Sequence, residues 1–387
     1  MSQMSPLQKM KAAYRQAYTM PRDDKLIVDC YMGILVAAFT PRLDESVWMY
    51  WVGPPGSGKT LAVAPMYKHS RVMMLSVPTP NALMSGYTNE DGSDPSLIPL
   101  LNGKVLIWKD FTALMKQGKV VVAKVVGEFR DCYDQHCSKH SGSSGLREYE
   151  SRFGMIACAT DEIDEFTNEH QQLGERFLTF RMNRIKMTHN QRVEDLRPIV
   201  DGMGKKKAWV NALQKYMHIQ IDKLLLTTEK MDTPSFCDEY NEQVRIMADL
   251  LALTRTSCGT TARRAELATR LVQQMINLGH GHCLADMRTT WNETEIDLLK
   301  RVMMDSLSAD RQRLIAYMYS RGQHRPAVTL AQMTLKSGST EKQMQQVIRQ
   351  YVFSSVLDPV REPNSNDTWY RLAEDIYKSI EKIGVLA

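Results

Sequence analysis

Eight consecutive residues of this chain have the types and the spacing needed to bind phosphate groups. They follow the pattern G-x-x-x-x-G-K-[ST] and are Gly53, Pro54, Pro55, Gly56, Ser57, Gly58, Lys59 and Thr60. Glycines let successive backbone N–H groups turn toward a β-phosphate without a Cβ in the way. Lys59 can then reach the β- and γ-phosphate oxygens, while the Thr60 hydroxyl can ligate Mg²⁺. The segment therefore predicts a site for ATP and Mg²⁺.

The flanking residues predict the elements that such a loop requires. Residues 47–52 form a continuous apolar run, which indicates a buried strand that leads into the loop. Residues 61–66 can follow as a helix whose N-terminus faces the bound anion. The local context is therefore strand, phosphate-binding loop and helix.

A second apolar run, residues 105–108, ends close to an acid, Asp110. A carboxylate at the end of such a strand can hold Mg²⁺ through water beside the phosphate loop. In the usual motif a glutamate follows the aspartate and polarises the attacking water, whereas here Phe111 follows Asp110. Either another carboxylate, for which Glu128 is a candidate, supplies the base, or hydrolysis is slow. The alternative for Glu128 is a solvated helix face.

A third apolar run, residues 153–159, ends at Thr160, whose hydroxyl can contact the γ-phosphate or the attacking water. Next come Arg176 and Phe177, and then a strand-like run over residues 178–182. In this order and spacing the chain resembles the AAA+ ATPases. The resemblance implies a homo-oligomer, a hexameric ring, in which Arg176 reaches the nucleotide of the neighbouring subunit.

Residues 261–271 sharpen this resemblance, because the segment is similar to the lid helix of minichromosome-maintenance (MCM) helicases. The resemblance implies that Arg263 touches the γ-phosphate, with Arg264 as the alternative register. A charged amphipathic helix remains the plain alternative. The likeness extends over residues 45–300 and also fits reduced MCM-like ATPases of phages and mobile elements. It implies these catalytic residues: Lys59, Asp110, Thr160, Arg176 and Arg263.

Gly142–Gly145 predicts the tip of a hairpin between the second and third strands. In MCM-like ATPases an insertion at this place projects toward DNA, which would make Lys139 and His140 DNA-contact residues; a solvated loop is the alternative. A zinc site that includes Cys132 and Cys137 with the neighbouring histidines is disfavoured, because the spacing matches no common structural pattern.

The C-terminal quarter has a pattern of its own. Thr340 is placed to cap a helix over residues 341–351, which follows a short helix and a turn at Gly338. Two strand-like runs flank a polar turn at 362–367. This order predicts a winged-helix domain that binds DNA or docks a protein. In the first case its second helix would present Lys342 and Arg349 to a major groove.

Composition sets the class of protein. The chain has 387 residues, 43% of them hydrophobic and 24% charged, which is ordinary for a globular protein. Its net charge is +5, too small to establish a nucleic-acid partner by itself. Seven cysteines, an odd number without a CxxC pair, suit a reducing compartment. With no apolar run of membrane-spanning length and no signal-peptide pattern, we expect no membrane partner and a cytoplasmic protein of a bacterium or a phage-infected host cell.

The expected fold class is α/β: an AAA+ P-loop core with a parallel sheet, an α-helical lid and a C-terminal winged-helix domain. The expected segments are an N-terminal helical segment (1–45), the ATPase core (46–185), the lid (186–300) and the winged helix (301–387). We expect an ATP-driven DNA motor, a replicative helicase that works with other replication proteins. The alternatives are an ATP-switched helicase loader or DNA-binding recruiter, and a MoxR-type protein-remodelling ATPase.

Overall fold

The computed structural model describes residues 4–17, 26–43, 45–76, 83–142, 145–170, 176–182, 188, 190, 193, 206–255, 267–322, 327–361 and 367–386. The chain forms two compact units, one made of residues 1–236 and 276–298 and the other of residues 237–275 and 299–387. None of the helices described is long and apolar enough to cross a membrane.

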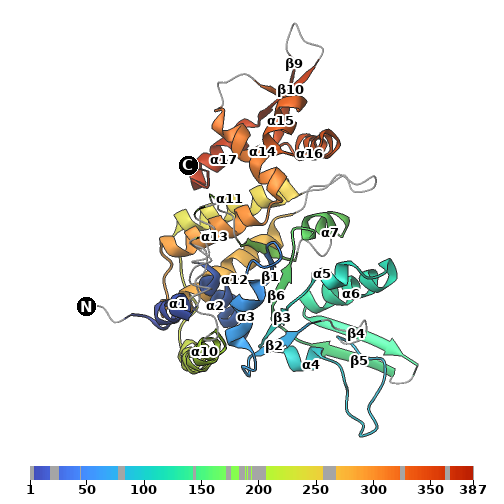
Figure 1. Ribbon diagram of the computed structural model, residues 1–387, viewed down its shortest axis with the longest axis vertical. Helices are drawn as coiled ribbons and strands as arrows, with labels where there is room; N and C mark the ends of the chain where they lie inside the picture. The colour runs from blue at the N-terminus through green and yellow to red at the C-terminus, as the bar shows by residue number, and fades with distance from the viewer. Residues whose placement is uncertain are drawn as a thin grey trace. The chain divides into compact units, whose positions relative to one another are not determined.

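The first unit is built on a five-stranded sheet. Its strands are β1 (Trp48–Val52), β2 (Val72–Leu75), β3 (Val105–Trp108), β6 (Gly154–Ala159) and β7 (Leu178–Arg181). They lie in the order β2-β3-β6-β1-β7 and every neighbouring pair is parallel (Figure 1). The expected α/β class with a parallel sheet is therefore confirmed. Because all the strands run the same way, the residues that follow them gather at one edge of the sheet.

Four of these strands coincide, to within one residue at each end, with the apolar runs that predicted them. They are buried along their whole length; β1, β3 and β6 are continuously apolar, whereas β7 also contains Thr179 and Arg181. Strand β2 was not predicted. It is an edge strand of four residues in which only Val72 is buried, so its sequence carries only a weak pattern of buried apolar residues.

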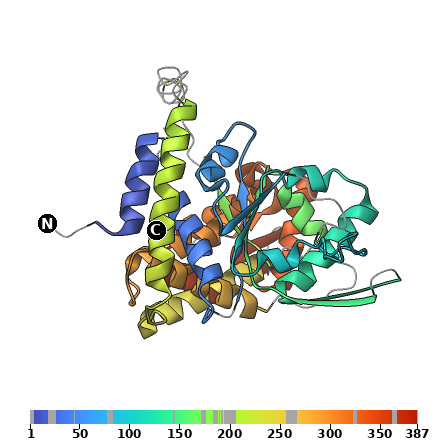
Figure 2. The same ribbon diagram turned by 90° about the horizontal axis from the view of Figure 1, so that it is seen from below.

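Helices surround the sheet of the first unit. They are α1 (Pro6–Ala17), α2 (Ile27–Phe39), α3 (Lys59–Val63), the 3-10 turn η2 (Ala64–Met66), α4 (Ile98–Leu101), α5 (Thr112–Met115), α6 (Lys119–Tyr133), α7 (Ile163–Glu169) and α10 (Lys206–Thr228). Helices α12 (Thr269–Ala285) and α13 (Glu293–Asp305) contribute residues to both units. Figure 2 shows α1 and α10 packed side by side.

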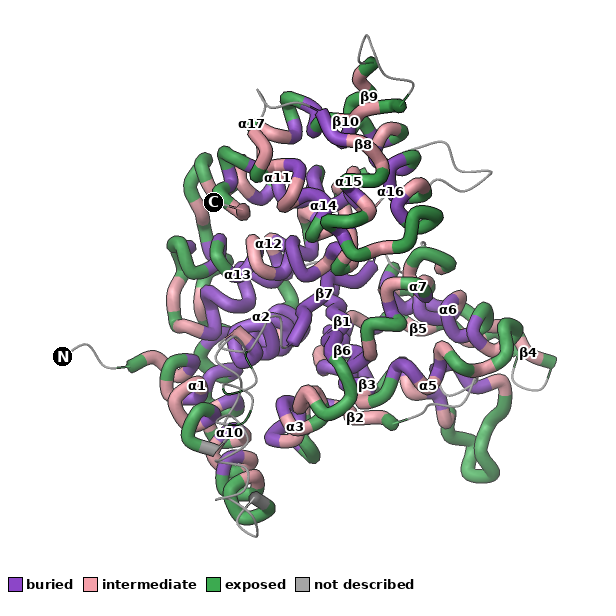
Figure 3. The backbone as a smooth tube through the Cα atoms, turned by 45° about the horizontal axis from the view of Figure 1, so that its top comes forward, coloured by how far each residue is buried: buried purple, intermediate pink, exposed green. Residues whose placement is uncertain are grey.

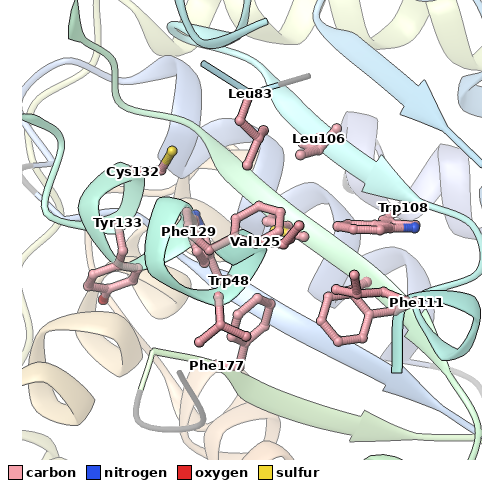
Figure 4. Packing of buried hydrophobic residues seen from close by; sticks show 14 of the residues in the cluster. Trp48, Leu83, Leu106, Trp108, Phe111, Val125, Phe129, Cys132, Tyr133 and Phe177 are labelled. Carbon is pink, nitrogen blue, oxygen red and sulfur yellow. The ribbon is translucent and has the colours of Figure 1, made fainter. Parts of the chain in front are cut away.

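Aromatic side chains fill the space between α6 and one face of the sheet (Figure 4). Trp48 of β1 lies edge-on to Phe129 of α6, with ring centroids 5.7 Å apart. Tyr50, two residues further along the strand, stacks on Phe177 at 4.0 Å. Alternate residues of a strand point to the same face, so Trp48 and Tyr50 contribute to one core. In Figure 3 the tube is coloured as buried along the central strands.

The opposite face of the sheet is covered by α2, which contacts β3 and β6. The helix is buried from Ile27 to Ala38. Its C-terminal carbonyl groups are held by Arg152, whose guanidinium donates hydrogen bonds to the carbonyl oxygens of Ala37 and Ala38, each at 2.9 Å. These bonds satisfy backbone acceptors that a helix end leaves unpaired.

The predicted hairpin is confirmed. Strands β4 (His136–Ser141) and β5 (Gly145–Glu150) pair antiparallel, with Ser141 opposite Gly145. One face of the hairpin packs against the preceding loop: Tyr149 donates a hydrogen bond to Asp94 at 2.5 Å, and Ser141 donates one to the carbonyl oxygen of Gly86 at 2.8 Å. The hairpin and the loop that contains residues 83–97 are therefore tied together.

The second unit contains α11 (Asp238–Arg255), α14 (Ala309–Ser320), α15 (Leu330–Ser337), α16 (Glu341–Phe353) and α17 (Glu374–Ile383). It also has a three-stranded antiparallel sheet in the order β8-β10-β9, formed by Val328–Thr329, Thr368–Leu372 and Leu357–Arg361 respectively. Thr340 caps α16 as predicted: its hydroxyl accepts from the backbone N–H of Gln343, and the Gln343 side chain accepts from the Thr340 N–H. The turn before it contains Gly338 at φ +70°, a conformation that favours glycine.

Candidate nucleotide-binding site

The loop between β1 and α3 has the backbone conformation that its glycines allow. Gly56 has φ +80° and Gly58 has φ +89°, both in the left-handed region. A Cβ on Gly53 would lie 2.7 Å from the Ser57 Oγ, so a larger residue there would collide with the loop itself. The positive φ of Gly56 and Gly58 and the close approach of Ser57 to Gly53 thus favour glycine at these three positions of the segment. Helix α3 is only five residues long before the η2 turn at Pro65.

Lys59 folds over this loop. Its Nζ donates hydrogen bonds to the carbonyl oxygens of Gly53 and Pro54, the latter at 3.0 Å. Burial lowers the pKa of Lys59, and the charges of Asp161 and Asp110 act in the opposite direction. The amine is therefore held among the backbone groups of the loop, with two carboxylates in its electrostatic surroundings.

The other predicted residues of the core follow neighbouring strands at the same edge. Asp110 follows β3, and Thr160 follows β6, which lies between β3 and β1. The Thr160 backbone N–H donates to the Thr112 hydroxyl at 3.1 Å, which joins the ends of β3 and β6. Thr60 and Asp110 are both exposed. The sheet thus gathers Lys59, Thr60, Asp110 and Thr160 at its carboxyl edge.

The donor set at this edge fits Mg²⁺. The hydroxyl of Thr60 and the carboxylate of Asp110 are hard oxygen ligands, and Mg²⁺ in phosphate sites keeps several waters besides such ligands. Asp110 Oδ1 accepts a hydrogen bond from the backbone N–H of Ala113 at 3.2 Å, which orients the carboxylate. No cluster of three or more His, Cys, Asp or Glu side chains that could hold a metal by itself occurs in the described part of the chain.

Arg176 lies at the opposite edge of the sheet. It comes two residues before β7, whose first residue, Leu178, is opposite Met49 near the start of β1. Its side chain is 7% exposed, pairs with Asp134 at 3.0 Å and lies over the ring of Tyr133. The length of a five-residue strand such as β1, about 17 Å, separates this edge from the phosphate-binding loop. Arg176 is therefore remote from the loop of its own chain.

Two residues at the carboxyl edge were missed by the sequence analysis, Asp161 and Arg181. Asp161 follows Thr160, and Arg181 ends β7 opposite Val52, the last residue before the loop. Their side chains form an ion pair with an N–O distance of 3.5 Å. A polar residue just after a strand was the available signal for Asp161. Arg181 had no such signal, because it lies within the strand-like run 178–182 and not after it.

Glu128 and Lys139, each predicted to act elsewhere, pair with one another at 3.5 Å. Glu128 is buried on α6, and burial raises the pKa of its carboxyl group, although Lys139 opposes this effect. Lys139 also donates to the carbonyl oxygen of Met84 at 2.5 Å. Both side chains thus take part in holding the hairpin to the body of the unit. The other hairpin candidate, His140, is exposed.

The hairpin also argues against a shared zinc site. Residues of β4 alternate in burial, so Cys137 is buried while His136 and His140 are exposed on the other face. Side chains on opposite faces of one strand cannot ligate the same ion.

The two DNA-contact candidates of the second unit lie on α16. Lys342 and Arg349 are exposed, whereas Met344, Val347 and Ile348 are buried and anchor the helix. Arg263, together with its alternative Arg264, lies outside the described residues.

Neither a protein-family model nor a curated protein matches this sequence.

Proposed function

We propose that this chain is an AAA+-type ATPase that works as a homo-oligomeric, ring-shaped DNA motor, most simply a replicative helicase. The observation that carries the proposal is the meeting of the phosphate-binding loop, Asp110 and Thr160 at one edge of a parallel sheet. Loop amides and Lys59 would bind the phosphates, and Mg²⁺ on Thr60 and Asp110 would neutralise their charge. Thr160 would orient the attacking water. That water bonds to the γ-phosphorus as the bond to the bridging oxygen breaks, releasing ADP and phosphate.

The position of Arg176 supports an oligomer. An arginine at the amino edge cannot reach the phosphates of its own chain, which lie beyond the length of the sheet. A neighbouring copy that presented its amino edge to this nucleotide would bring Arg176 within reach of transition-state charge. The hexameric ring and cooperation with other replication proteins are parts of this proposal, as is a location in the cytoplasm.

Contact with DNA is assigned to the second unit. Its helices α14 to α16 and its small antiparallel sheet follow the order of a winged helix, and α16 presents Lys342 and Arg349 to solvent. The β4–β5 hairpin of the first unit is less suited to bind the phosphate backbone of DNA. Its two cations, Lys139 and Arg147, are mostly buried in ion pairs, while Glu148 and Glu150 are exposed.

One observation favours the second candidate, an ATP-switched loader or DNA-binding recruiter. The residue after Asp110 is Phe111, which is fully buried and packs edge-on against Tyr50 at 5.4 Å. A core aromatic thus stands where the usual water-polarising glutamate would be. A protein that acts mainly by binding ATP tolerates slow hydrolysis.

A protein-remodelling ATPase of the MoxR type is the third candidate. It would need a pore loop with an aromatic residue; the Gly142–Gly145 tip of the hairpin has none, but Tyr87 is an aromatic residue in the loop beside the hairpin. This tyrosine is 58% exposed. It stands between Gly86, which accepts a hydrogen bond from Ser141, and Thr88, which accepts one from Arg147. An exposed aromatic side chain therefore accompanies the hairpin.

The test is the ATPase rate with and without single- and double-stranded DNA, together with strand displacement on a forked duplex. Stimulation by DNA together with unwinding supports the motor. DNA binding that requires ATP, with little turnover and no unwinding, replaces it with the switch. An ATPase that is indifferent to DNA points to the protein remodeller, and a chain that binds no nucleotide overturns all three.

A further inference from the structure

The side chain of Arg181 crosses the root of the phosphate-binding loop, which is the point after Val52 where β1 ends and the loop begins. Arg181 ends β7, whereas its ionic partners, Asp161 and Asp164, follow β6. Strand β1 lies between these two strands and leads directly into the loop. Strands two positions apart in a sheet are separated by about 10 Å. An ion pair across that gap therefore passes over the end of β1.

Backbone contacts fix this geometry. Gly53 donates a hydrogen bond to the carbonyl oxygen of Ala159 on one side, at 3.2 Å. On the other side the N–H of Met182 donates to the carbonyl oxygen of Val52 at 2.8 Å. The three strand ends are thus joined up to the first residue of the loop. The Gly53 carbonyl oxygen also accepts from Lys59 Nζ, so the two cations share one neighbourhood.

The two carboxylates that hold Arg181 are not equivalent. Asp164 stands in the first turn of α7, is 26% exposed in its side chain and is the closer partner. Asp161 is 69% exposed and lies 3.5 Å from the guanidinium. Its charge also acts to raise the pKa of Lys59. The more exposed carboxylate, in the longer of the two contacts, is the group that an incoming phosphate oxygen would most easily replace.

We propose that Arg181 recognises the γ-phosphate in cis, by exchanging its contact with Asp161 for a γ-phosphate oxygen while Asp164 keeps it in place. This inference rests on the proposed nucleotide site and adds to it the means of distinguishing ATP from ADP. In the ADP-bound chain Arg181 remains paired with Asp161, because no γ-phosphate competes. The exchange also releases the Asp161 carboxylate beside the γ-phosphate. This carboxylate lies at the carboxyl edge of the sheet, where Phe111 stands in place of the glutamate that usually polarises the attacking water.

Two substitutions are expected to act in opposite directions. Arg181→Gln removes the contact and should weaken the affinity for a β,γ-imido analogue of ATP by about 10- to 100-fold, the value of one charged hydrogen bond. Asp161→Asn removes the competitor and should strengthen the affinity for the same analogue. Neither substitution should change ADP affinity more than about twofold. Both affinities are measured by isothermal titration calorimetry on the full chain with Mg²⁺.

Lys116→Gln is the matched control, because Lys116 is an exposed cation near the same edge, paired with Glu162 at 3.7 Å. It should leave both affinities unchanged. If Arg181→Gln weakens ADP and analogue equally, or Asp161→Asn weakens the analogue, Arg181 is a structural brace and the inference is wrong. If Arg181→Gln does not fold, Asp161→Asn decides, since its side chain is mostly exposed. A wild-type chain that binds neither nucleotide would overturn the proposed function itself.

Discussion

Arg181 is the last residue of the short strand β7 and Arg176 lies two residues before its start, so the two arginines are at opposite edges of the parallel sheet. Arg181 is level with the root of the phosphate-binding loop, and Arg176 is level with the start of β1. Both are buried and both are paired with aspartates of their own chain. Under the proposed function, Arg181 would serve the nucleotide of its own chain and Arg176 that of a neighbouring copy.

This division predicts a specific result for Arg176→Ala. ATP affinity should stay within a few-fold of the wild type, because the side chain is far from its own loop. Turnover should fall by about 10³-fold or more, the usual value of an arginine supplied in trans. The ATPase rate and nucleotide affinity of the purified variant check this, with Asp134→Asn as a control that breaks the ion pair and leaves Arg176 in place.

Mixing Arg176→Ala with Lys59→Ala makes the test sharper. Each variant alone is expected to be inactive, but a mixed oligomer would contain interfaces with an intact loop on one side and an intact arginine on the other. Some turnover should therefore return. Activity that stays at the sum of the two separate variants would contradict action in trans.

Lys59→Ala alone should abolish ATP turnover, because it removes the cation that reaches the β- and γ-phosphates. The side chain is partly exposed and bonded only to its own loop, so the free energy of unfolding should change by less than about 0.5 kcal/mol. ATPase assays and urea unfolding of the same preparation check both statements, with Lys116→Gln as the control. Retained turnover would mean that the loop is not the working site.

The loop and the strands around it could be predicted from the sequence because their signals are local. A glycine pattern and buried apolar runs are visible over a few residues. Arg181 and Asp161 are brought together by the sheet order β6-β1-β7, which no spacing along the chain encodes. For Lys139 the sequence is misleading. Its position in a polar arm of the hairpin suggests a surface contact, whereas its pairing with the buried Glu128 depends on how α6 packs.

DNA binding through α16 predicts a change in salt dependence. Lys342→Glu and Arg349→Glu each remove an exposed cation that contributes nothing to the core, so folding should be unaffected. Each lost phosphate contact should reduce the slope of log affinity against log salt by about 0.9. Fluorescence anisotropy of labelled duplex at several salt concentrations measures it. Lys378→Glu on α17, where the lysine is 65% exposed, is the control, and an equal effect there would remove α16 as the specific contact.

A buried ionic network in the first unit provides the last prediction. His282 of α12 lies between Glu295 of α13, at 2.6 Å, and Asp29 of α2, at 3.0 Å. Lys11 pairs with Asp29 at 2.6 Å, and Arg288 pairs with Glu295. Arg288 also pairs with Asp286 at 3.0 Å. Four helices are therefore tied together by a network whose centre, formed by Asp29, His282 and Glu295, is buried.

The pKa shifts in this network set its pH range. Burial acts to lower the pKa of His282, but the hydrogen bonds and charges of Asp29 and Glu295 outweigh it and raise that pKa above 6.5. The stability from His282 is therefore fully present below pH 6.5 and is lost as the pH rises through the raised value. Burial acts to raise the pKa of Glu295, but its partners lower it to about 2, so its stability is present above pH 4.5 and is lost toward pH 2. The network should therefore stabilise the folded chain most between about pH 4.5 and pH 6.5.

His282→Gln should lower the free energy of unfolding by about 3 kcal/mol or more within that range, because it leaves two buried carboxylates without their shared cation. The difference from the wild type should shrink at alkaline pH, where the wild-type imidazole is neutral as well. Urea unfolding followed by tryptophan fluorescence measures this at each pH, since five of the six tryptophans belong to the first unit. His136→Gln, at an exposed position of β4, is the control. A difference that stays constant from pH 5 to pH 9 would show that His282 acts by shape and not by charge.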